Sequence, residues 1–149
     1  DAGDHGGLRV DFPGGWEGDE MNLFTAEGRA KATKNTDGLE VPQGQAADLF
    51  DFVSHLFQWR KTKDVIHNGK TVHFMTRDNT YGYFRYDDDD VVFVYINNSN
   101  RPKNIPWTYY KEISEGLKGG VNIITGEPCE VSDATVAEPQ SVLIVEYKR

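Results

Sequence analysis

Apolar residues recur at helical spacing in one stretch of the chain, residues 45–61, which reads QAADLFDFVSHLFQWRK. Five apolar side chains stand three or four positions apart and therefore share one face of a helix: Leu49, Phe50, Val53, Leu56 and Phe57. Phe52 and Trp59 widen this face, which predicts a packing partner on each of two sides of the helix. Arg60 and Lys61 suit the negative end of the helix dipole.

After residue 66 the pattern changes to the alternation and short apolar runs that are typical of β-strands. Strands are predicted at 70–77, 81–87, 91–97, 107–113, 121–125 and 141–147, with a further short one near 129–132. Turn-forming residues separate them at 78–79, 87–90, 97–102, 119–120 and 126–128. Because no helix stands between successive strands, we predict a mainly β fold, an antiparallel Greek-key β-sandwich, rather than a parallel sheet.

The first 44 residues show neither period and hold most of the 15 glycines, so they are expected to form a long loop. Loops of this length in compact domains are usually functional. The predicted organisation is therefore a loop over 1–44, a helix and turn over 45–66, and a β-domain over 67–149. The chain opens with DAGDHGGL and no initiator Met, which we interpret as the result of cleavage or truncation.

Composition narrows the range of partners. The net charge is −8, with 24 acidic against 16 basic side chains, so nucleic acid and anionic lipid are not expected partners. No apolar run approaches the roughly 18 residues that a membrane span needs. The single cysteine, Cys129, can form no internal disulfide and is expected to be a small packed residue.

Several chemical signatures are missing from the sequence. It has no phosphate-binding glycine loop with its Lys, and its four histidines lack metal-ligand spacing, so no cofactor or metal is predicted. The aspartates 87–90 could supply oxygens to Ca²⁺, but they lack the Gly and Glu of an EF-hand loop, which favours a solvated turn. Asn97-Asn98-Ser99 matches the triplet for N-glycosylation.

Candidate binding chemistry concentrates in residues 5–29, HGGLRVDFPGGWEGDEMNLFTAEGR. Trp16 offers an apolar ring face on which a sugar can stack, and Arg9 and Asp11 offer directed hydrogen bonds to hydroxyls. These three residues are the predicted substrate-binding residues. The alternative is that Phe12 and Trp16 only anchor a long loop.

The same stretch carries a family resemblance. Residues 5–16 (HGGLRVDFPGGW), followed by 22–25 (NLFT) and 28–29 (GR), resemble the loop after the eighth barrel strand in the α-amylase superfamily, above all in neopullulanase and cyclomaltodextrinase-like members. Residues 49–61, which end in Trp-Arg-Lys and run into 62–69, are similar to the last barrel helix and the turn after it. The resemblance identifies the chain as a C-terminal piece of such an enzyme.

The resemblance implies a parent glycosidase that hydrolyses α-1,4 and, in some members, α-1,6 glucosidic bonds with retention. Its catalytic carboxylates, two Asp and one Glu, lie on barrel strands upstream, so no catalytic residue is assigned and this chain alone is predicted to be inactive. Arg9, Asp11 and Trp16 would belong to the cleft that binds an α-glucan, either starch or maltooligosaccharide. The β-domain would support the barrel. A bacterial periplasmic or secreted parent is implied.

Two other expectations concern the isolated chain. The barrel-facing side of the helix would be exposed, or covered by a second copy in a dimer. A stand-alone carbohydrate-binding β-sandwich is the alternative function, with Trp107, Tyr109 and Tyr110 as its stacking platform unless these rings pack at the sandwich edge. A protein-interaction sandwich has only the acidic surface in its favour.

Overall fold

The structure is a computed structural model, and it describes residues 45–149, with side chains from Leu49 onward. The chain divides into two units, residues 1–58 and Trp59–Arg149, which are described separately. The helix α2 (Gln45–Lys61) has the predicted bounds and ends in Arg60 and Lys61. Its apolar face is largely open to solvent, since 62% of Leu49 and 61% of Phe57 is exposed.

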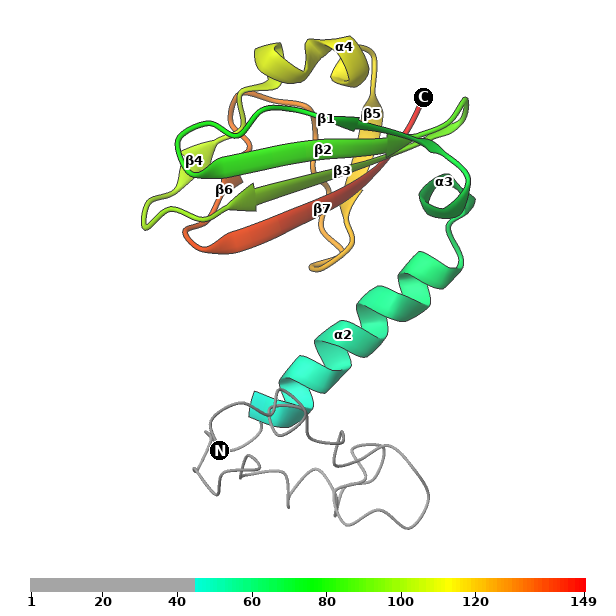
Figure 1. The fold of residues 1–149 in the computed structure, drawn as a ribbon, viewed down its shortest axis with the longest axis vertical. Coiled ribbons are helices and arrows are strands. Elements are labelled where there is room, and N and C mark those ends of the chain that lie inside the picture. Colours follow the sequence, from blue (N-terminus) through cyan, green and yellow to red (C-terminus); the bar gives the residue numbers. More distant parts are fainter. Residues whose placement is uncertain (1–44) are drawn as a thin grey trace, which may run out of the picture. The chain divides into compact units, whose positions relative to one another are not determined.

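The second unit is built on a five-stranded antiparallel sheet (Figure 1). In spatial order its strands are β1 (Lys70–His73), β2 (Thr80–Tyr86), β3 (Asp90–Asn97), β7 (Ser141–Lys148) and β5 (Lys118–Asn122). All eight residues of β3 pair with β7, and Phe93 stands opposite Phe84 on one side and Val145 on the other. The predicted mainly β, antiparallel fold is confirmed.

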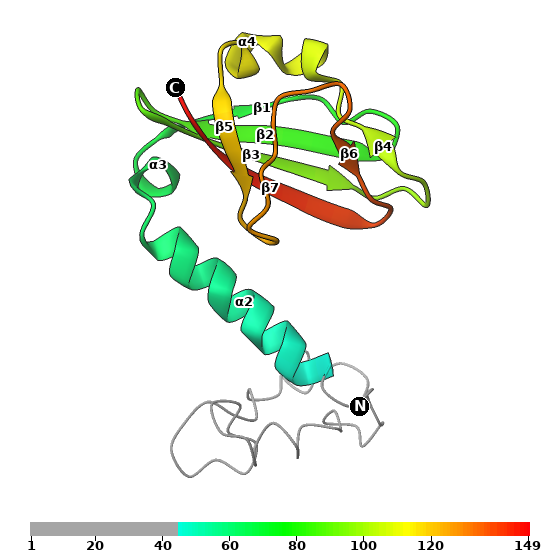
Figure 2. The same ribbon diagram turned by 180° about the vertical axis from the view of Figure 1, so that it is seen from behind.

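A smaller layer covers one face of this sheet (Figure 2). It contains the paired strands β4 (Lys103–Asn104) and β6 (Val136–Ala137), the 3-10 helix η2 (Trp107–Tyr110) and the short helix α4 (Lys111–Ser114). Side chains of this layer and of the sheet form one core, in which Phe93 meets Phe84, Trp107 and Tyr110 at ring-centroid distances of 4.5, 4.9 and 5.2 Å. The two layers together give the sandwich its core.

The strand predicted at 107–113 is wrong, because this segment is helical. Trp107, Tyr110 and Ile113 are all buried, and their spacing of three residues is that of a helix rather than of a strand. Pro106 stands at the start of η2. The adjacent aromatic residues Tyr109 and Tyr110 are typical of a strand, but the buried side chains are those at every third position.

Two smaller corrections concern the segment after α4. The predicted turn at Gly119-Gly120 lies inside β5, where a Cβ on Gly120 would stand 2.2 Å from the Tyr147 ring and 2.1 Å from the Cys129 carbonyl oxygen. The glycine therefore serves close packing rather than a turn. The short strand predicted near 129–132 is reduced to an isolated bridge between Val121 and Pro128, and the pairing strand β6 lies further on.

Candidate functional site

The predicted substrate-binding residues Arg9, Asp11 and Trp16 lie outside the described residues and stay predictions. The stacking platform considered for the alternative function does not form, and its rings pack in the domain instead. Trp107 and Tyr110 are only 5% and 2% exposed, because η2 turns both rings into the core. Tyr109 is half-buried beneath the guanidinium of Arg77, 4.7 Å from its ring centroid. Candidate function in the described residues therefore lies elsewhere, on the outer face of the sheet and in the loops at one of its ends.

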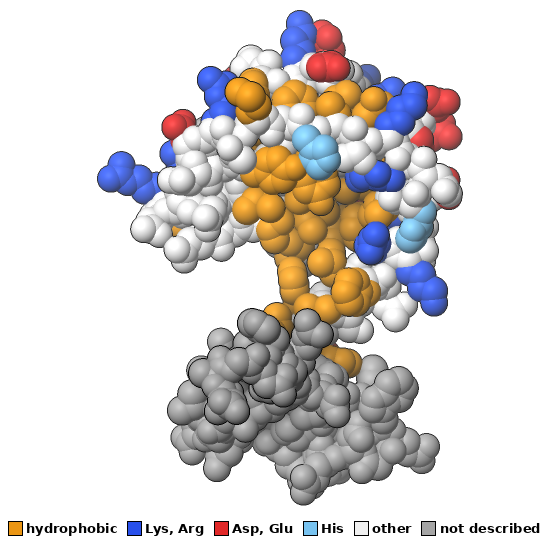
Figure 3. Space-filling model, viewed as in Figure 1, with side chains coloured by type: hydrophobic (Ala, Val, Ile, Leu, Met, Phe, Trp, Pro, Cys, Tyr) orange, Lys and Arg blue, Asp and Glu red, His pale blue; other side chains and the backbone are white. Residues whose placement is uncertain are grey.

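The outer face of the sheet is the face turned away from the core. In β3, Val91, Phe93 and Tyr95 belong to the core, so Val92, Val94 and Ile96 point to the outer face. The register places further apolar or aromatic residues beside them on β2 and β7: Tyr81, Tyr83, Val142 and Ile144. Figure 3 shows hydrophobic side chains gathered on this face. Val92, Val94 and Ile144 are nearly buried, Tyr81, Tyr83 and Val142 are half-buried, and Ile96 is exposed, so the face is apolar but only partly open to solvent.

Aromatic rings line the β1–β2 side of the outer face. The rings of His73 and Tyr81 are nearly parallel, at 7°, with centroids 6.2 Å apart, and Nδ1 of His73 is hydrogen-bonded to the Tyr81 hydroxyl. Tyr83 follows at a centroid distance of 5.8 Å from Tyr81. Burial is the main reason that the pKa of Tyr83 is raised.

Two charged residues of the outer face, Glu146 and Arg85, are bound by the segment that leads into the sheet. Lys63 forms an ion pair of 2.6 Å with Glu146, and the indole N–H of Trp59 donates to the same carboxylate at 3.2 Å. Arg85 donates to the carbonyl of Ile66 in the helix α3 (Asp64–His67) at 2.6 Å. These bonds tie residues 59–67 to the sheet and leave the central outer face apolar.

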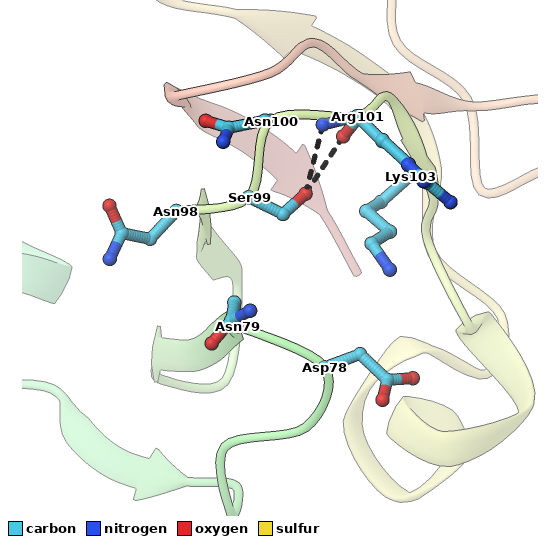
Figure 4. Close-up of a pocket in the computed structure, with 7 residues that line it drawn as sticks. All are labelled: Asp78, Asn79, Asn98, Ser99, Asn100, Arg101 and Lys103. Carbon is cyan, nitrogen blue, oxygen red and sulfur yellow. Dashed lines mark hydrogen bonds between the residues drawn. The ribbon is translucent and has the colours of Figure 1, made fainter.

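A polar pocket lies between the β1–β2 turn and the loop after β3 (Figure 4). It measures about 360 Å³ and is lined by Asp78, Asn79, Asn98, Ser99, Asn100, Arg101 and Lys103. A neighbouring pocket of about 380 Å³ shares Asp78, Asn79 and Asn98 with it and reaches Tyr81 and Ile96 on the outer face. We call the two together the loop pocket. Its first part is lined by polar and charged side chains, and its second part adds the side chains of Tyr81 and Ile96.

The residue types explain the turn on one side of the loop pocket. Asp78 and Asn79 have φ of 47° and 59°, the left-handed region that these two residue types tolerate best among non-glycine residues. Arg77 and Thr80 exchange backbone hydrogen bonds of 3.0 and 2.7 Å across the turn. The turn predicted at 78–79 is thus confirmed as a tight hairpin that presents both side chains outward.

Asn97 anchors the other side of the loop pocket. Its side chain is fully buried, and its amide donates to the carbonyl oxygens of Arg101, Ala137 and Glu138 at 2.9 to 3.0 Å. Its own oxygen accepts from the backbone N–H of Ser99 at 3.0 Å. Asn97 is therefore a structural residue, and in the folded domain its amide nitrogen is not accessible for glycosylation.

The aspartate run forms a capped turn between β2 and β3. The Asp87 carboxylate accepts the backbone N–H groups of Asp89 and Asp90 at 3.0 and 2.8 Å, and these bonds are the main reason that its pKa is lowered. Asp90 pairs with Lys148. Among residues 45–149, no group of three or more His, Cys, Asp or Glu is placed to hold a metal ion.

Two further observations concern reactivity and membranes. Cys129 is buried, and burial raises the pKa of its thiol, which favours the unreactive protonated form. Within the described part of the chain, no helix has both the length and the apolar character to cross a membrane.

Comparison with known proteins finds one matching family and several solved structures of similar fold. The family described as the cyclo-malto-dextrinase C-terminal domain matches residues 71–146. An α-amylase from Anoxybacillus shares 13% identity over 75% of this chain and 27% of its own, with a TM-score of 0.55. The α-amylase of Geobacillus thermoleovorans complexed with acarbose shares 10% identity over 68% of this chain and 23% of its own, at 0.55.

AmyP in complex with maltotriose shares 19% identity over 75% of this chain and 23% of its own, with a TM-score of 0.56. At these identities the three structures show a common fold. The chain spans about a quarter of the length of the solved proteins it matches.

Proposed function

Because the chain belongs to the family of cyclo-malto-dextrinase C-terminal domains, we propose that it works as the C-terminal part of a larger glycoside hydrolase of the α-amylase type. In that protein the β-domain supports the catalytic barrel, and the substrate is an α-glucan such as starch or a maltooligosaccharide. Two solved proteins of the same fold are α-amylases, one of them bound to acarbose, and a third, AmyP, is bound to maltotriose. The domain contributes to that activity as a scaffold.

The outer face of the sheet is the observation that carries this proposal. Val94 and Ile96 of β3 stand opposite Ile144 and Val142 of β7 on this face, and 37% of the Ile96 side chain is exposed. Burying one such side chain completely contributes about 1.5–3 kcal/mol. Since three quarters of each similar solved protein lies outside the matched part, a neighbouring domain of the same polypeptide is the natural cover.

The remaining parts of the chain receive roles that follow from the family. Residues 1–44 form the loop after the last barrel strand, 45–66 the last barrel helix and its turn, and 67–149 the C-terminal domain. Arg9, Asp11 and Trp16 belong to the substrate cleft. The open apolar face of α2, with Leu49 and Phe57, packs on the barrel in the parent protein and can be covered by a second copy in the isolated chain.

The proposed packing of the outer face against a neighbouring domain of the parent protein, its docking role, is tested by a charge placed on that face. Ile96→Lys in the parent protein should bury a charge at the interface, lowering the melting temperature and the maltooligosaccharide activity together. Val136→Lys is the matched control, because Val136 is similarly exposed, 43% against 37%, but lies on β6 in the other layer. In the isolated 149-residue chain both variants should unfold within about 0.5 kcal/mol of the wild type.

The outcomes separate clearly. A parent protein whose melting temperature and activity are unchanged by Ile96→Lys contradicts the docking role. The isolated chain should not turn over maltooligosaccharides, because the proposal assigns the catalytic carboxylates to the barrel. Measurable turnover by the pure chain would refute that assignment.

A further inference from the structure

Glu146 connects the segment between α2 and β1 to the last strand of the sheet. Its Oε1 accepts from Nζ of Lys63 at 2.6 Å, and its Oε2 accepts from the indole N–H of Trp59 at 3.2 Å. Only 27% of the Lys63 side chain and 19% of the Glu146 side chain are exposed, so salt screens this ion pair less than a fully exposed one. One carboxylate therefore binds both the last turn of α2 and the residue before α3 to β7.

Arg85 holds the same segment from β2. Its guanidinium donates to the carbonyl oxygens of Val65 at 3.3 Å and of Ile66 at 2.6 Å, both in α3, and also to the hydroxyl of Thr71 on β1. The last carbonyls of a helix have no partner within the helix, so Arg85 satisfies groups that need one. The short helix α3 is thus bonded to the sheet at its end.

The two attachment points lie in one row across three strands. Arg85 stands opposite Val92 of β3, and Val92 stands opposite Glu146 of β7. Neighbouring strands are about 4.8 Å apart, so roughly 10 Å separates the two charged residues across the sheet. Between them, α3 contacts β2 and β3, and Val65 and Val92 are each 2% exposed. A segment bound at two separated points resists rotation about either of them.

The end of the segment is also built for close packing. A Cβ on Gly69 would stand 2.3 Å from the Val65 carbonyl oxygen and 2.9 Å from that of Tyr86, so any other residue would push α3 away from the sheet. The backbone N–H groups of Asn68 and Gly69 donate to the carbonyls of Asp64 and Val65 at 2.8 and 3.1 Å. The turn into β1 is therefore an ordered, hydrogen-bonded structure.

We propose that Glu146 and Arg85 form a clamp that makes residues 59–69 an integral part of the β-domain, as a rigid junction rather than a flexible linker. All bonds of the clamp lie within the unit Trp59–Arg149, whereas the matched family domain starts only at residue 71. The consequence for the parent protein rests on the proposed function. The last turn of α2 then belongs both to the last barrel helix and to the β-domain, and the clamp is the connection through which this domain supports the barrel.

The test uses the ¹⁵N-labelled 149-residue chain, in which Trp59→Phe identifies one of the three indole N–H resonances as that of Trp59. Glu146→Gln keeps the shape of the side chain but removes its charge. It should shift the Trp59 indole resonance and speed hydrogen exchange at the amides of Asn68 and Gly69 about tenfold, the effect expected from weakening bonds to a charged group. The amide of Phe93 in the core should keep its rate.

Two further variants frame this result. Lys63→Met removes the cation instead of the carboxylate and should speed exchange at the same two amides. Glu112→Gln is the matched control, because it removes the same charge from an exposed residue of α4, in the layer over the inner face. It should change neither the Trp59 resonance nor the exchange rates. Equal resonances and rates in Glu146→Gln and the wild type would overturn the inference.

In the parent protein, Glu146→Gln should lower the melting temperatures of both the barrel and the β-domain, measured by calorimetry, and Glu112→Gln should lower neither. A barrel whose melting temperature is unchanged would overturn the role of the clamp in supporting it. Ile96 stands opposite Val142, away from the row of the clamp, so Ile96→Lys should leave the Trp59 resonance in place. A failed clamp beside a positive docking result therefore removes only this inference.

Discussion

The two faces of the five-stranded sheet are both apolar, yet only the inner one is closed by the layer that contains β4, β6, η2 and α4. The inner face is closed by η2, α4 and the β4–β6 pair, and Phe84, Phe93 and Val145 there are fully buried. The outer face carries Tyr81, Tyr83 and Ile96 under no such layer. A sheet that needed only its own core would alternate apolar with polar residues, so the second apolar face points to a neighbour.

The two faces also treat polar atoms differently. On the inner face, the indole N–H of Trp107 is buried with no hydrogen-bond partner among the described residues, and the buried Tyr147 hydroxyl has the weakly hydrogen-bonding Cys129 thiol beside it. An unsatisfied buried group costs about 1–3 kcal/mol, which packing on that face has to offset. The inner face is therefore dominated by packing. On the outer face, the charged side chains of Glu146 and Arg85 are hydrogen-bonded.

The largest effect is expected on the inner face. Phe93→Ala should lower the free energy of unfolding of the isolated chain by about 3–5 kcal/mol, because it opens a cavity among Phe84, Trp107 and Tyr110. Urea unfolding followed by circular dichroism measures the change. A loss below about 1 kcal/mol would mean that this face is not the core.

A smaller effect is expected from pH and again separates the faces. Burial raises the pKa of the inner-face phenols of Tyr110 and Tyr147 well above the usual value near 10. As the pH rises, the phenols of the unfolded chain lose their protons before those of the folded chain. The contribution of these phenols to the free energy of unfolding is therefore fully present below about pH 10 and is lost as the pH rises above it. Urea midpoints measured at neutral pH and above about pH 10 record the fall.

Tyr147→Phe is the matched variant for this measurement. It keeps the ring but removes the buried hydroxyl, which interacts only weakly with the Cys129 thiol, so it should be nearly neutral at pH 7 and should weaken the fall at high pH. Tyr83→Phe on the outer face should weaken it less. Equal slopes for the wild type and Tyr147→Phe would contradict the assignment of the fall to that phenol.

The smallest effect is expected on the outer face of the isolated chain. Ile96→Ala should cost less than about 1 kcal/mol there, since the side chain is already 37% exposed and no layer packs on it. The same urea experiment used for Phe93→Ala measures it. A cost close to that of Phe93→Ala would show that the isolated chain covers the outer face by itself, and the contrast between the faces would disappear.

Much of the fold follows from local periodicity. The helix over 45–61 and the strands that became β2, β3 and β7 were predictable because their apolar residues repeat with one clear period or in a continuous run. The segment from Trp107 to Ile113 was not, because adjacent aromatic residues suit a strand while burial follows every third position. Only the packed core distinguishes the two interpretations.

The loop pocket was missed for a different reason. Asp78-Asn79 and the segment from Asn97 were recognised as turn signals but were considered one at a time. In consecutive antiparallel strands, the β1–β2 turn and the loop after β3 must lie at the same end of the sheet, so topology alone could have brought them together. The tie from Asn97 to Ala137 spans 40 residues and has no local sequence signal.

The position of β7 has a consequence for synthesis on the ribosome. Ser141–Lys148 is the last of the described strands to be made, yet it lies between β3 and β5. Until it emerges, the growing polypeptide holds a β2–β3 hairpin whose free edge of β3 has all its pairing groups open to other nascent chains. Closure of the sheet is therefore a late, long-range event, and crowded polysomes are where this domain is most prone to aggregate.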